Sequence, residues 1–251
     1  MRNSAEGRFD SGRISALNNE LANIDDLQRR LHLIAQYVPG RIAFSTSMGH
    51  EDQAVLHAIA ASGAAIDVFT LDTGRLFQET FDTIDASEKR YGIKIRVVAP
   101  DAKDLTDLVA RDGVNGFRTS LHARKSCCSV RKVQPLNREL SGAQGWMTGL
   151  RRSQAAGRNA IDFAEAVPTQ ALVKLSPIAD WSPEQLRDFL HDNDVPVNVL
   201  HAQGYPSIGC QSCTRAIRPG EDIRAGRWWW ENEDGKECGL HTRTNKIGDS
   251  L

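Results

Sequence analysis

The sequence predicts an α/β protein built on a doubly wound, mostly parallel sheet. Short apolar runs of strand length alternate with segments of helical period between residues 41 and 191. Three of these runs end in turns that contain Ser, Thr, Gly or Asp. Strands that alternate with helices form parallel sheets, because each helix returns the chain to the edge where the last strand began. From about residue 195 the regular pattern fades, so we expect an irregular C-terminal tail over the sheet.

The composition is that of an ordinary globular protein. The chain has 251 residues and 40% apolar content, enough to bury a full core. Its formal net charge of -1 gives no global attraction to nucleic acid or to an anionic membrane, so any anion site must be local. No stretch approaches the roughly 20 apolar residues of a membrane span, and the charged N-terminus has no apolar signal region. We therefore expect a cytoplasmic protein whose partners include neither nucleic acid nor membrane, and whose thiols stay reduced.

The first half of the chain predicts a helical lead followed by three units of strand and helix. Residues 14–38 carry apolar side chains at helical spacing and stop at Pro39-Gly40, which indicates one helix or a helix pair. Strands are expected at 41–44, 66–71 and 94–98, and helices at 53–61, 76–91 and 102–112.

The second half is less regular. Residues 113–125 are interpreted as a basic loop, after which a helix is expected to start near Ser126 or Ser129 and to run to Gly142, with Pro135 an awkward member. Two further strands are expected at 146–150 and 171–178, and a helix capped by Ser182 should end at His191. We divide the chain into an N-terminal helical segment (1–40), an α/β domain (41–200) and a C-terminal segment (201–251).

Four of the five cysteines form two pairs, the adjacent Cys127-Cys128 and the pair Cys210 and Cys213. Four thiolates brought together by folding can hold a zinc ion or an iron–sulfur cluster. Structural zinc prefers two to four residues between paired ligands, and adjacent cysteines do not fit that spacing. The alternative is that all are small buried apolar residues. The pairing, in a chain with one other cysteine, favours a ligand set.

The fifth cysteine, Cys238, has Gly239 beside it and His241 three residues further on. This context is typical of an exposed, deprotonated nucleophile, whereas a structural cysteine would sit in an apolar run. A single thiol needs an external thiol to complete a redox cycle, which indicates a dithiol partner protein.

Turns at three strand ends predict a local anion site. The turns are 45–49, 72–74 and 149–152, and the carboxyl ends of parallel strands line one crevice. Arginine binds sulfate and phosphate through its planar fork. Taken singly, each turn could be a plain capped turn and each cation part of a solvated face. The basic residues near these turns and near the cysteines are Lys132, Arg151, Arg152, Arg158, Arg224 and Arg227.

These motifs together resemble the assimilatory adenylylsulfate (APS) reductases, which share the fold of the phosphoadenylylsulfate (PAPS) reductases. The resemblance covers most of the chain, from Arg41 to His241, and the order of its parts is highly specific. It implies a Rossmann-like, adenine nucleotide alpha-hydrolase-like fold for the α/β domain. The matching segments are 44–52, 71–80, 127–132, 149–154, 210–213, 224–229 and 237–241.

The resemblance implies a role for each matching residue. Cys238 would attack the sulfate sulfur of APS, expel AMP and form an S-sulfocysteine, from which thioredoxin releases sulfite for cysteine biosynthesis. The two cysteine pairs would bind a [4Fe-4S] cluster through Cys127, Cys128, Cys210 and Cys213. The substrate would contact Ser45, Ser47, Asp72, Thr73, Gly74, Lys132, Gly149, Arg152, Arg158, Arg224, Arg227 and His241. A homo-oligomer is expected from the family resemblance alone.

The chain departs from the family pattern at one place, and three alternative functions stay open. The loop 155–157 before Arg158 is shorter than in relatives, which puts that residue's role in doubt. PAPS reductases lack the four paired cysteines, yet a PAPS or dual APS/PAPS substrate stays open, because the 3′-phosphate pocket cannot be read from the sequence. ATP-dependent adenylating or thiolating enzymes carry a Ser-Gly-Gly-x-Asp-Ser turn, which residues 45–50 lack. The last alternative is a cluster-bearing sensor module.

Overall fold

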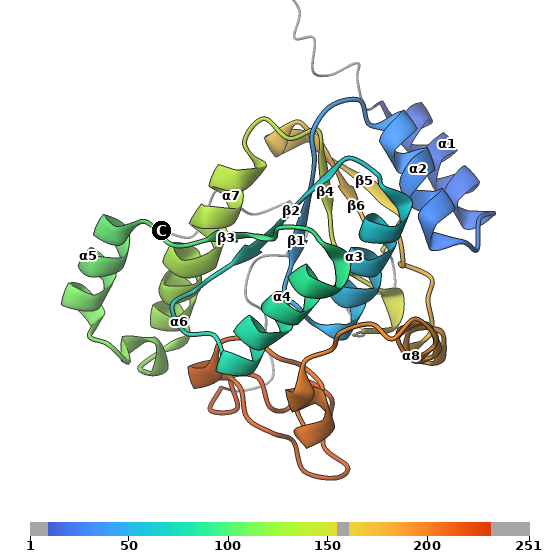
Figure 1. The fold of residues 1–251 in the computed structure, drawn as a ribbon. Helices are drawn as coiled ribbons and strands as arrows, with labels where there is room; N and C mark the ends of the chain where they lie inside the picture. Colours follow the sequence, from blue (N-terminus) through green and yellow to red (C-terminus); the bar gives the residue numbers. More distant parts are fainter. Residues whose placement is uncertain (1–9, 155–160, 232–251) are drawn as a thin grey trace, which may run out of the picture. The chain divides into compact units, whose positions relative to one another are not determined.

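The computed structural model describes residues 10–154 and 161–231 (Figure 1). A six-stranded sheet has the strand order β3-β2-β1-β4-β6-β5. Strand β4 pairs in parallel with β1 and β6, with Met147 opposite Phe44 on one side and Leu175 on the other, and β5 pairs antiparallel with β6. The predicted α/β class with a mostly parallel sheet is confirmed. The strands are β1 Ile42–Thr46, β2 Ile66–Leu71, β3 Arg96–Val98, β4 Gly145–Met147, β5 Ala164–Val167 and β6 Leu172–Leu175.

By its internal contacts the chain divides into two compact units, each assembled from segments far apart in the sequence. The first unit comprises 1–69, 83–96 and 140–197. The second unit comprises 70–82, 97–139 and 198–251.

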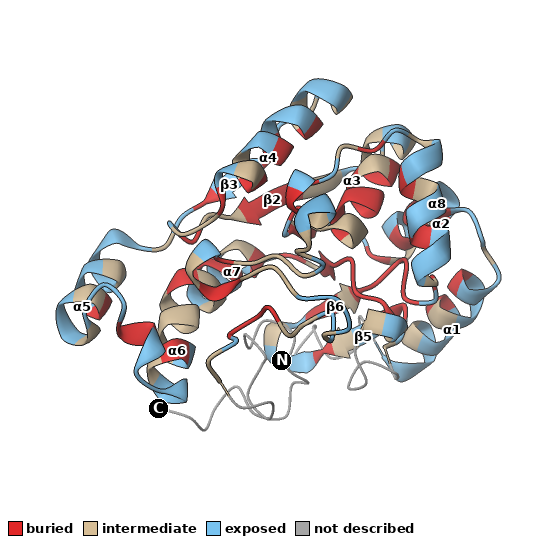
Figure 2. Cartoon of the chain, turned by 90° about the horizontal axis from the view of Figure 1, so that it is seen from below, coloured by how far each residue is buried: buried red, intermediate tan, exposed pale blue. Residues whose placement is uncertain are grey.

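The helices of the first unit bury most of their apolar side chains. The leading helical segment, predicted as one helix or a pair, is a pair, α1 (Ser11–Ala22) and α2 (Leu27–Tyr37). Asp10 and Asp26 cap the two helices by accepting amide hydrogen bonds. Helix α3 (His50–Ser62) packs against α2 and α8 (Pro183–Asp192), and the face turned to these neighbours is buried (Figure 2). A capping box at Ser182 starts α8 as predicted. Helix α4 spans Gln78–Tyr91.

In the second unit, the predicted basic loop at 113–125 ends earlier than predicted, because a helix begins at Leu121. Beyond α5 (Ala102–Asp112), a short turn leads into α6 (Leu121–Cys128), which Ser120 caps. A π-helical segment (Ser129–Val133) then joins α6 to α7 (Gln134–Leu140), so the helix also starts earlier than predicted. Pro135 lacks an amide proton and its ring clashes with the carbonyl four residues back in a regular helix. The wider π turn just before it relieves this conflict.

Other differences concern strands. Strand β5 is absent from the predicted strands, because its four residues include two alanines and a glutamate, which disfavour strands. The predicted strands at 146–150 and 171–178 are shorter than expected. Between α8 and residue 231 the described chain is irregular as predicted, with two short 3-10 helices, Val199–Gln203 and Gln211–Cys213. Within residues 10–154 and 161–231, no helix is long and apolar enough to cross a membrane.

Candidate active site

The turn between β1 and α3, in the first unit, is organised by Asp52. Its Oδ2 accepts hydrogen bonds from the amide and the hydroxyl of Ser47, each at 2.6 Å. Its Oδ1 accepts from the amide of Gly149 at 3.0 Å. Burial raises the pKa of this carboxyl to about 6, although the hydrogen bonds from Ser47 oppose the shift. Asp52 therefore ties the turn that follows β1 to the residues that follow β4.

The backbone around Asp52 is closely fitted. A Cβ atom on Gly149 would lie 2.4 Å from Asp52 Oδ1 and 2.9 Å from its amide nitrogen, so the position requires glycine. Met48 adopts a φ of 61°, which non-glycine residues rarely do, and its amide donates to Thr46 Oγ1 at 3.0 Å. Such strained residues concentrate at functional sites.

A buried ion pair lies at the start of α3. Arg151 Nη2 is 2.7 Å from Glu51 Oε1, and Arg151 also donates to the backbone oxygen of Trp181. Burial favours the neutral form of Glu51, but hydrogen bonds from Gln154 and Arg151 outweigh it and lower the pKa of that carboxyl. Burial, aided by Arg151, lowers the pKa of His50. Arg151 therefore holds the start of α3 through its ion pair with the Glu51 carboxylate.

Two other sequence-predicted residues of the first unit also have protein partners. Ser45 Oγ accepts from Trp146 Nε1 at 2.8 Å. Arg152 donates from Nε to the backbone oxygen of Ile161 at 2.7 Å, and its guanidinium lies 5.3 Å from the centre of the Phe163 ring.

The four paired cysteines all lie in the second unit. Cys210 and Cys213 are buried in an apolar cluster with Phe117 and Trp228, and Cys127 packs against this cluster. Cys128 ends α6 and interacts electrostatically with Arg124, one turn earlier in the same helix. All four are free of disulfides. In the described part of the chain, no group of three or more His, Cys, Asp or Glu side chains is arranged to hold a metal ion.

Cys210 has a polar environment despite its burial. Its sulfur lies 3.2 Å from Thr73 Oγ1. Burial favours the neutral thiol, but Lys132, the Thr73 hydrogen bond, Arg227 and Arg131 together lower the pKa of Cys210. Lys132 is thus one of the cations that favour the thiolate form of Cys210.

The turn 72–74, predicted to line the nucleotide cleft, is itself built around the same residues. Asp72 Oδ1 accepts from the amide of Gly74 at 2.7 Å, and the backbone oxygen of Thr73 accepts from Arg131 Nη1 at 2.5 Å. Gly74 has a φ of +66°, and a Cβ there would stand 3.3 Å from Arg131 Nη1. Glycine is therefore required both by the backbone conformation and by the approach of the arginine.

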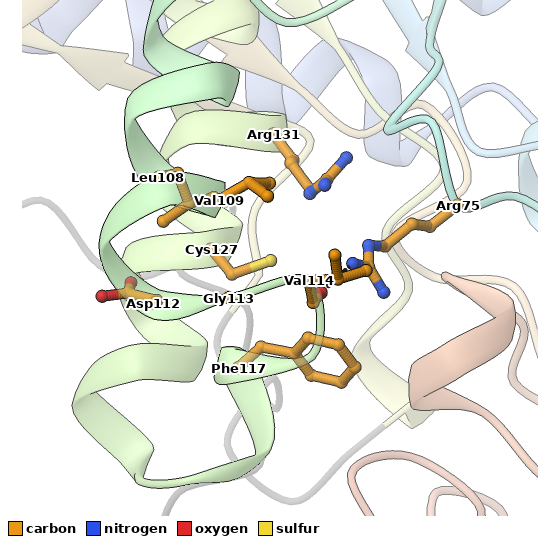
Figure 3. A pocket seen from close by; sticks show the side chains of 9 residues that line it. All are labelled: Arg75, Leu108, Val109, Asp112, Gly113, Val114, Phe117, Cys127 and Arg131. Atoms are coloured by element: carbon orange, nitrogen blue, oxygen red, sulfur yellow. Dashed lines mark hydrogen bonds between the residues drawn. The ribbon is translucent and has the colours of Figure 1, made fainter.

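A small pocket borders Cys127. Figure 3 shows the Cys127 sulfur directed toward the same space as the guanidinium groups of Arg75 and Arg131. The Nε atoms of both arginines are buried and have no hydrogen-bond partner among the described residues. Burial raises the pKa of the Cys127 thiol, and Arg131 opposes the rise. The pocket is thus lined by one thiol and by the guanidinium groups of two arginines.

The remaining predicted arginines lie in the irregular part of the second unit. Arg227 is buried, donates from Nη1 to Ser207 Oγ at 3.3 Å and to the backbone oxygen of Ile208 at 3.2 Å, and stacks on Trp228. Arg224 is half-buried, and its amide donates to an aspartate side chain. The predicted roles of Arg158, Cys238 and His241 fall outside the described residues.

Sequence reasoning missed three residues of this region. Asp52 was not among the predicted site residues, although its place after a Ser-rich turn is a signal. Arg124 precedes Cys128 by four residues, a spacing that places both on one helix face. No sequence signal places Arg131 against Thr73, because that contact joins segments 58 residues apart.

Comparisons with known proteins identify the family. The family model described as "Phosphoadenosine phosphosulfate reductase domain" matches residues 41–216. The adenosine 5'-phosphosulfate reductase of Agrobacterium fabrum is 50% identical over 227 residues, covering 90% of this chain and 86% of that protein. The protein of the same name from Burkholderia cepacia is 46% identical over 231 residues, covering 92% of each chain.

Among solved structures, the PAPS reductase from Candida auris in a phosphate complex has a TM-score of 0.71 and 21% identity, and the match covers 83% of this chain and 98% of that one. At this identity it shows the fold alone, which is the predicted Rossmann-like, adenine nucleotide alpha-hydrolase-like one. From the family model and the relatives that are half identical, the chain belongs to the phosphoadenosine phosphosulfate reductase family, as its sequence motifs indicated.

Proposed function

We propose that this chain reduces adenosine 5'-phosphosulfate to sulfite and AMP, with thioredoxin as the electron donor, in the assimilation of sulfate into cysteine. The observation that carries the proposal is the combination of about half-identical relatives, named adenosine 5'-phosphosulfate reductases, with two cysteine pairs held in one structural unit.

The cysteines fit a [4Fe-4S] cluster better than a single ion. Zinc holds its ligands about 2.3 Å from one centre, which forces four sulfurs close together. Ligands of a cluster stand further apart, because its own iron and sulfide atoms lie between them. Cys127, Cys210 and Cys213 are loosely grouped around Phe117 and Trp228, and Cys128 is adjacent to Cys127. This looser grouping agrees with the larger [4Fe-4S] cluster. When bound, the cluster would supply a compact charged group beside Lys132.

The chain's own residues would do the chemistry. The Cys238 thiolate would attack the sulfur of APS, forming a sulfur–sulfur bond while the bond from sulfur to the AMP phosphate oxygen breaks and AMP leaves. A thioredoxin thiolate would then attack Cys238, releasing sulfite and forming a mixed disulfide. The second thioredoxin thiol resolves this disulfide, so the dithiol supplies both electrons. AMP is a good leaving group, so alignment and charge neutralisation matter more than acid catalysis.

Each unit contributes some of the proposed substrate contacts. In the first unit, the turn held by Asp52 offers Ser45 and Ser47, with Gly149 and Arg152 at the end of β4. In the second unit, the cationic groups near the cysteines are suited to neutralise a sulfonate. Near the cysteines these comprise Lys132 and Arg227, and Asp72, Thr73 and Gly74 form the adjacent turn. Arg224, three residues before Arg227, is proposed to join them. Arg158 and His241 would complete the set.

A cytoplasmic location and a homo-oligomer are also proposed. The nearest competing function is reduction of PAPS, alone or together with APS. The paired cysteines favour APS.

The proposed function is tested by steady-state assays with reduced thioredoxin. Anaerobically purified protein should release sulfite and AMP in equal amounts from APS, and Cys238→Ser should abolish both products while leaving the brown colour of the cluster. Product release by Cys238→Ser at the wild-type rate would refute the proposed nucleophile. Turnover with PAPS only would refute the substrate.

A further inference from the structure

One buried guanidinium in the second unit contacts three different groups. The Arg124 side chain, in α6, is fully buried. Its Nε and Nη2 donate to the two carboxylate oxygens of Glu231, each at 2.9 Å, in a bidentate pair. The guanidinium lies 4.5 Å from the centre of the Trp228 ring, and it interacts electrostatically with the side chain of Cys128, one helical turn further along α6. The first cysteine pair is therefore linked through one side chain to residue 231.

The second cysteine pair reaches the same segment through the backbone. The Trp228 amide donates to the Cys213 carbonyl at 3.1 Å, and the Glu231 amide donates to the Trp228 carbonyl at 2.9 Å. Trp228 is 2% exposed and has a φ of 42°, in the left-handed region. A non-glycine residue keeps such a conformation only where its surroundings impose it. The segment 228–231 is therefore held to both cysteine pairs.

The ion pair itself is unlike those on the surface. The side chains of Arg124 and Glu231 are 0% and 9% exposed, so both charges have left water and each depends on the other. The pair between Arg215 and Glu221, in the same unit, has similar lengths of 2.8 and 3.0 Å, but its side chains are 34% and 28% exposed. A partly exposed pair of this kind is screened by water and contributes less than a buried one. It provides a matched control.

We call the ion pair between Arg124 and Glu231 the anchor. It matters for the chain that follows Glu231, because that chain carries Cys238. Cys238 follows seven residues later. An extended residue spans at most about 3.6 Å, so the chain keeps Cys238 within about 25 Å of Glu231. Whatever fixes Glu231 thus limits where the thiol can reach.

We propose that Arg124 is a positioning residue: it fixes the start of the segment that carries Cys238, and its contact with Cys128 makes that anchor depend on the state of the cysteine site. The roles of Cys128 and Cys238 rest on the proposed function, whereas the anchor rests on the contacts of Arg124 alone.

The test compares trypsin cleavage after Lys236, followed by intact mass as the loss of residues 237–251. The proteins are the wild type, Glu231→Gln, and the matched control Glu221→Gln, each with its cluster and after iron removal by a chelator. Glu231→Gln should accelerate cleavage by about ten-fold or more, because hydrogen bonds to a charged partner are lost, and Glu221→Gln should not. Iron removal should accelerate cleavage of the wild type and add nothing in Glu231→Gln.

Each outcome decides a separate claim. Equal cleavage of Glu231→Gln and wild type would overturn the anchor, and equal acceleration by iron removal in both would overturn its dependence on the cysteine site. Should Glu231→Gln fail to fold by circular dichroism, Arg124→Lys, which keeps the charge and loses the fork, should show an intermediate cleavage rate. Wild type that forms no Cys238 adduct with APS would end the proposed function, while the cleavage comparison would still decide the anchor.

Discussion

The hydroxyl oxygen of Thr73 lies 3.2 Å from the sulfur of Cys210, inside the second unit. Thr73 follows β2 directly, and Cys210 lies 137 residues later, so the contact ties a strand-end turn to the second cysteine pair. The hydrogen bond also helps to lower the pKa of Cys210. Thr73 was predicted to line the nucleotide cleft, and in the structure its hydroxyl contacts the Cys210 sulfur.

Thr73→Val should weaken the retention of iron. Valine keeps the shape of threonine but cannot hydrogen-bond the Cys210 sulfur, a loss of about 1 kcal/mol that corresponds to about five-fold faster loss of iron in air. The measurement is the decay of the visible absorbance of the cluster. Thr106→Val, on an exposed face of α5, is the control, because its hydroxyl bonds only within that helix. Equal decay of the two variants would contradict the role of Thr73.

Gly149→Ala should destabilise the first unit. The added methyl group would lie 2.4 Å from Asp52 Oδ1 and 2.9 Å from backbone atoms at the start of α3. Overpacking of this kind costs about 1 to 3 kcal/mol, measurable by chemical denaturation. Gly49→Ala, whose Cβ would meet Ser47 Oγ at an ordinary 3.5 Å, should cost less. A larger loss for Gly49→Ala would mean that the fit around Gly149 is loose.

Asp52 should make stability depend on pH. Its pKa is raised from 3.8 to about 6 in the folded chain, so the folded state holds the proton more tightly than the unfolded state. The resulting stabilisation is complete below the unfolded pKa and is lost as pH rises through about 6. At 1.36 kcal/mol per unit, the loss is about 3 kcal/mol.

The comparison with Asp52→Asn isolates this contribution, because other titrating groups are common to both proteins. The free energy of unfolding of the wild type, relative to Asp52→Asn, should fall between pH 4.5 and pH 7.5. A difference that is constant across this range, or that rises with pH, would show that the carboxyl is ionised throughout.

The sequence predicts the fold well where local patterns are strong. The leading helix pair, β2, α5 and the capped α8 follow from apolar period and capping residues alone. The helix that carries Cys127-Cys128 was placed too late, because the basic residues before it suggested a loop. Strand β5 has no apolar alternation, and only its pairing with β6 makes it a strand.

The candidate site was predictable in its residue types but not in its connections. The cysteine pairs stand out from sequence spacing alone, and the family resemblance extends to the turns. The contacts of Asp52 with Gly149, of Thr73 with Cys210 and of Arg124 with Glu231 join residues about 100 or more positions apart. Such pairings depend on the folded chain, and no local pattern encodes them.

The measurement that tests the central claim most directly is intact-protein mass spectrometry after mixing anaerobic protein with APS, with PAPS or with neither, in the absence of thioredoxin. The account predicts one sulfonate adduct with APS, mapped to Cys238, absent from Cys238→Ser and released as sulfite by reduced thioredoxin. An adduct formed with PAPS alone would keep the mechanism and change the substrate. No adduct with either nucleotide, in protein whose cluster is intact, would contradict the reductase function.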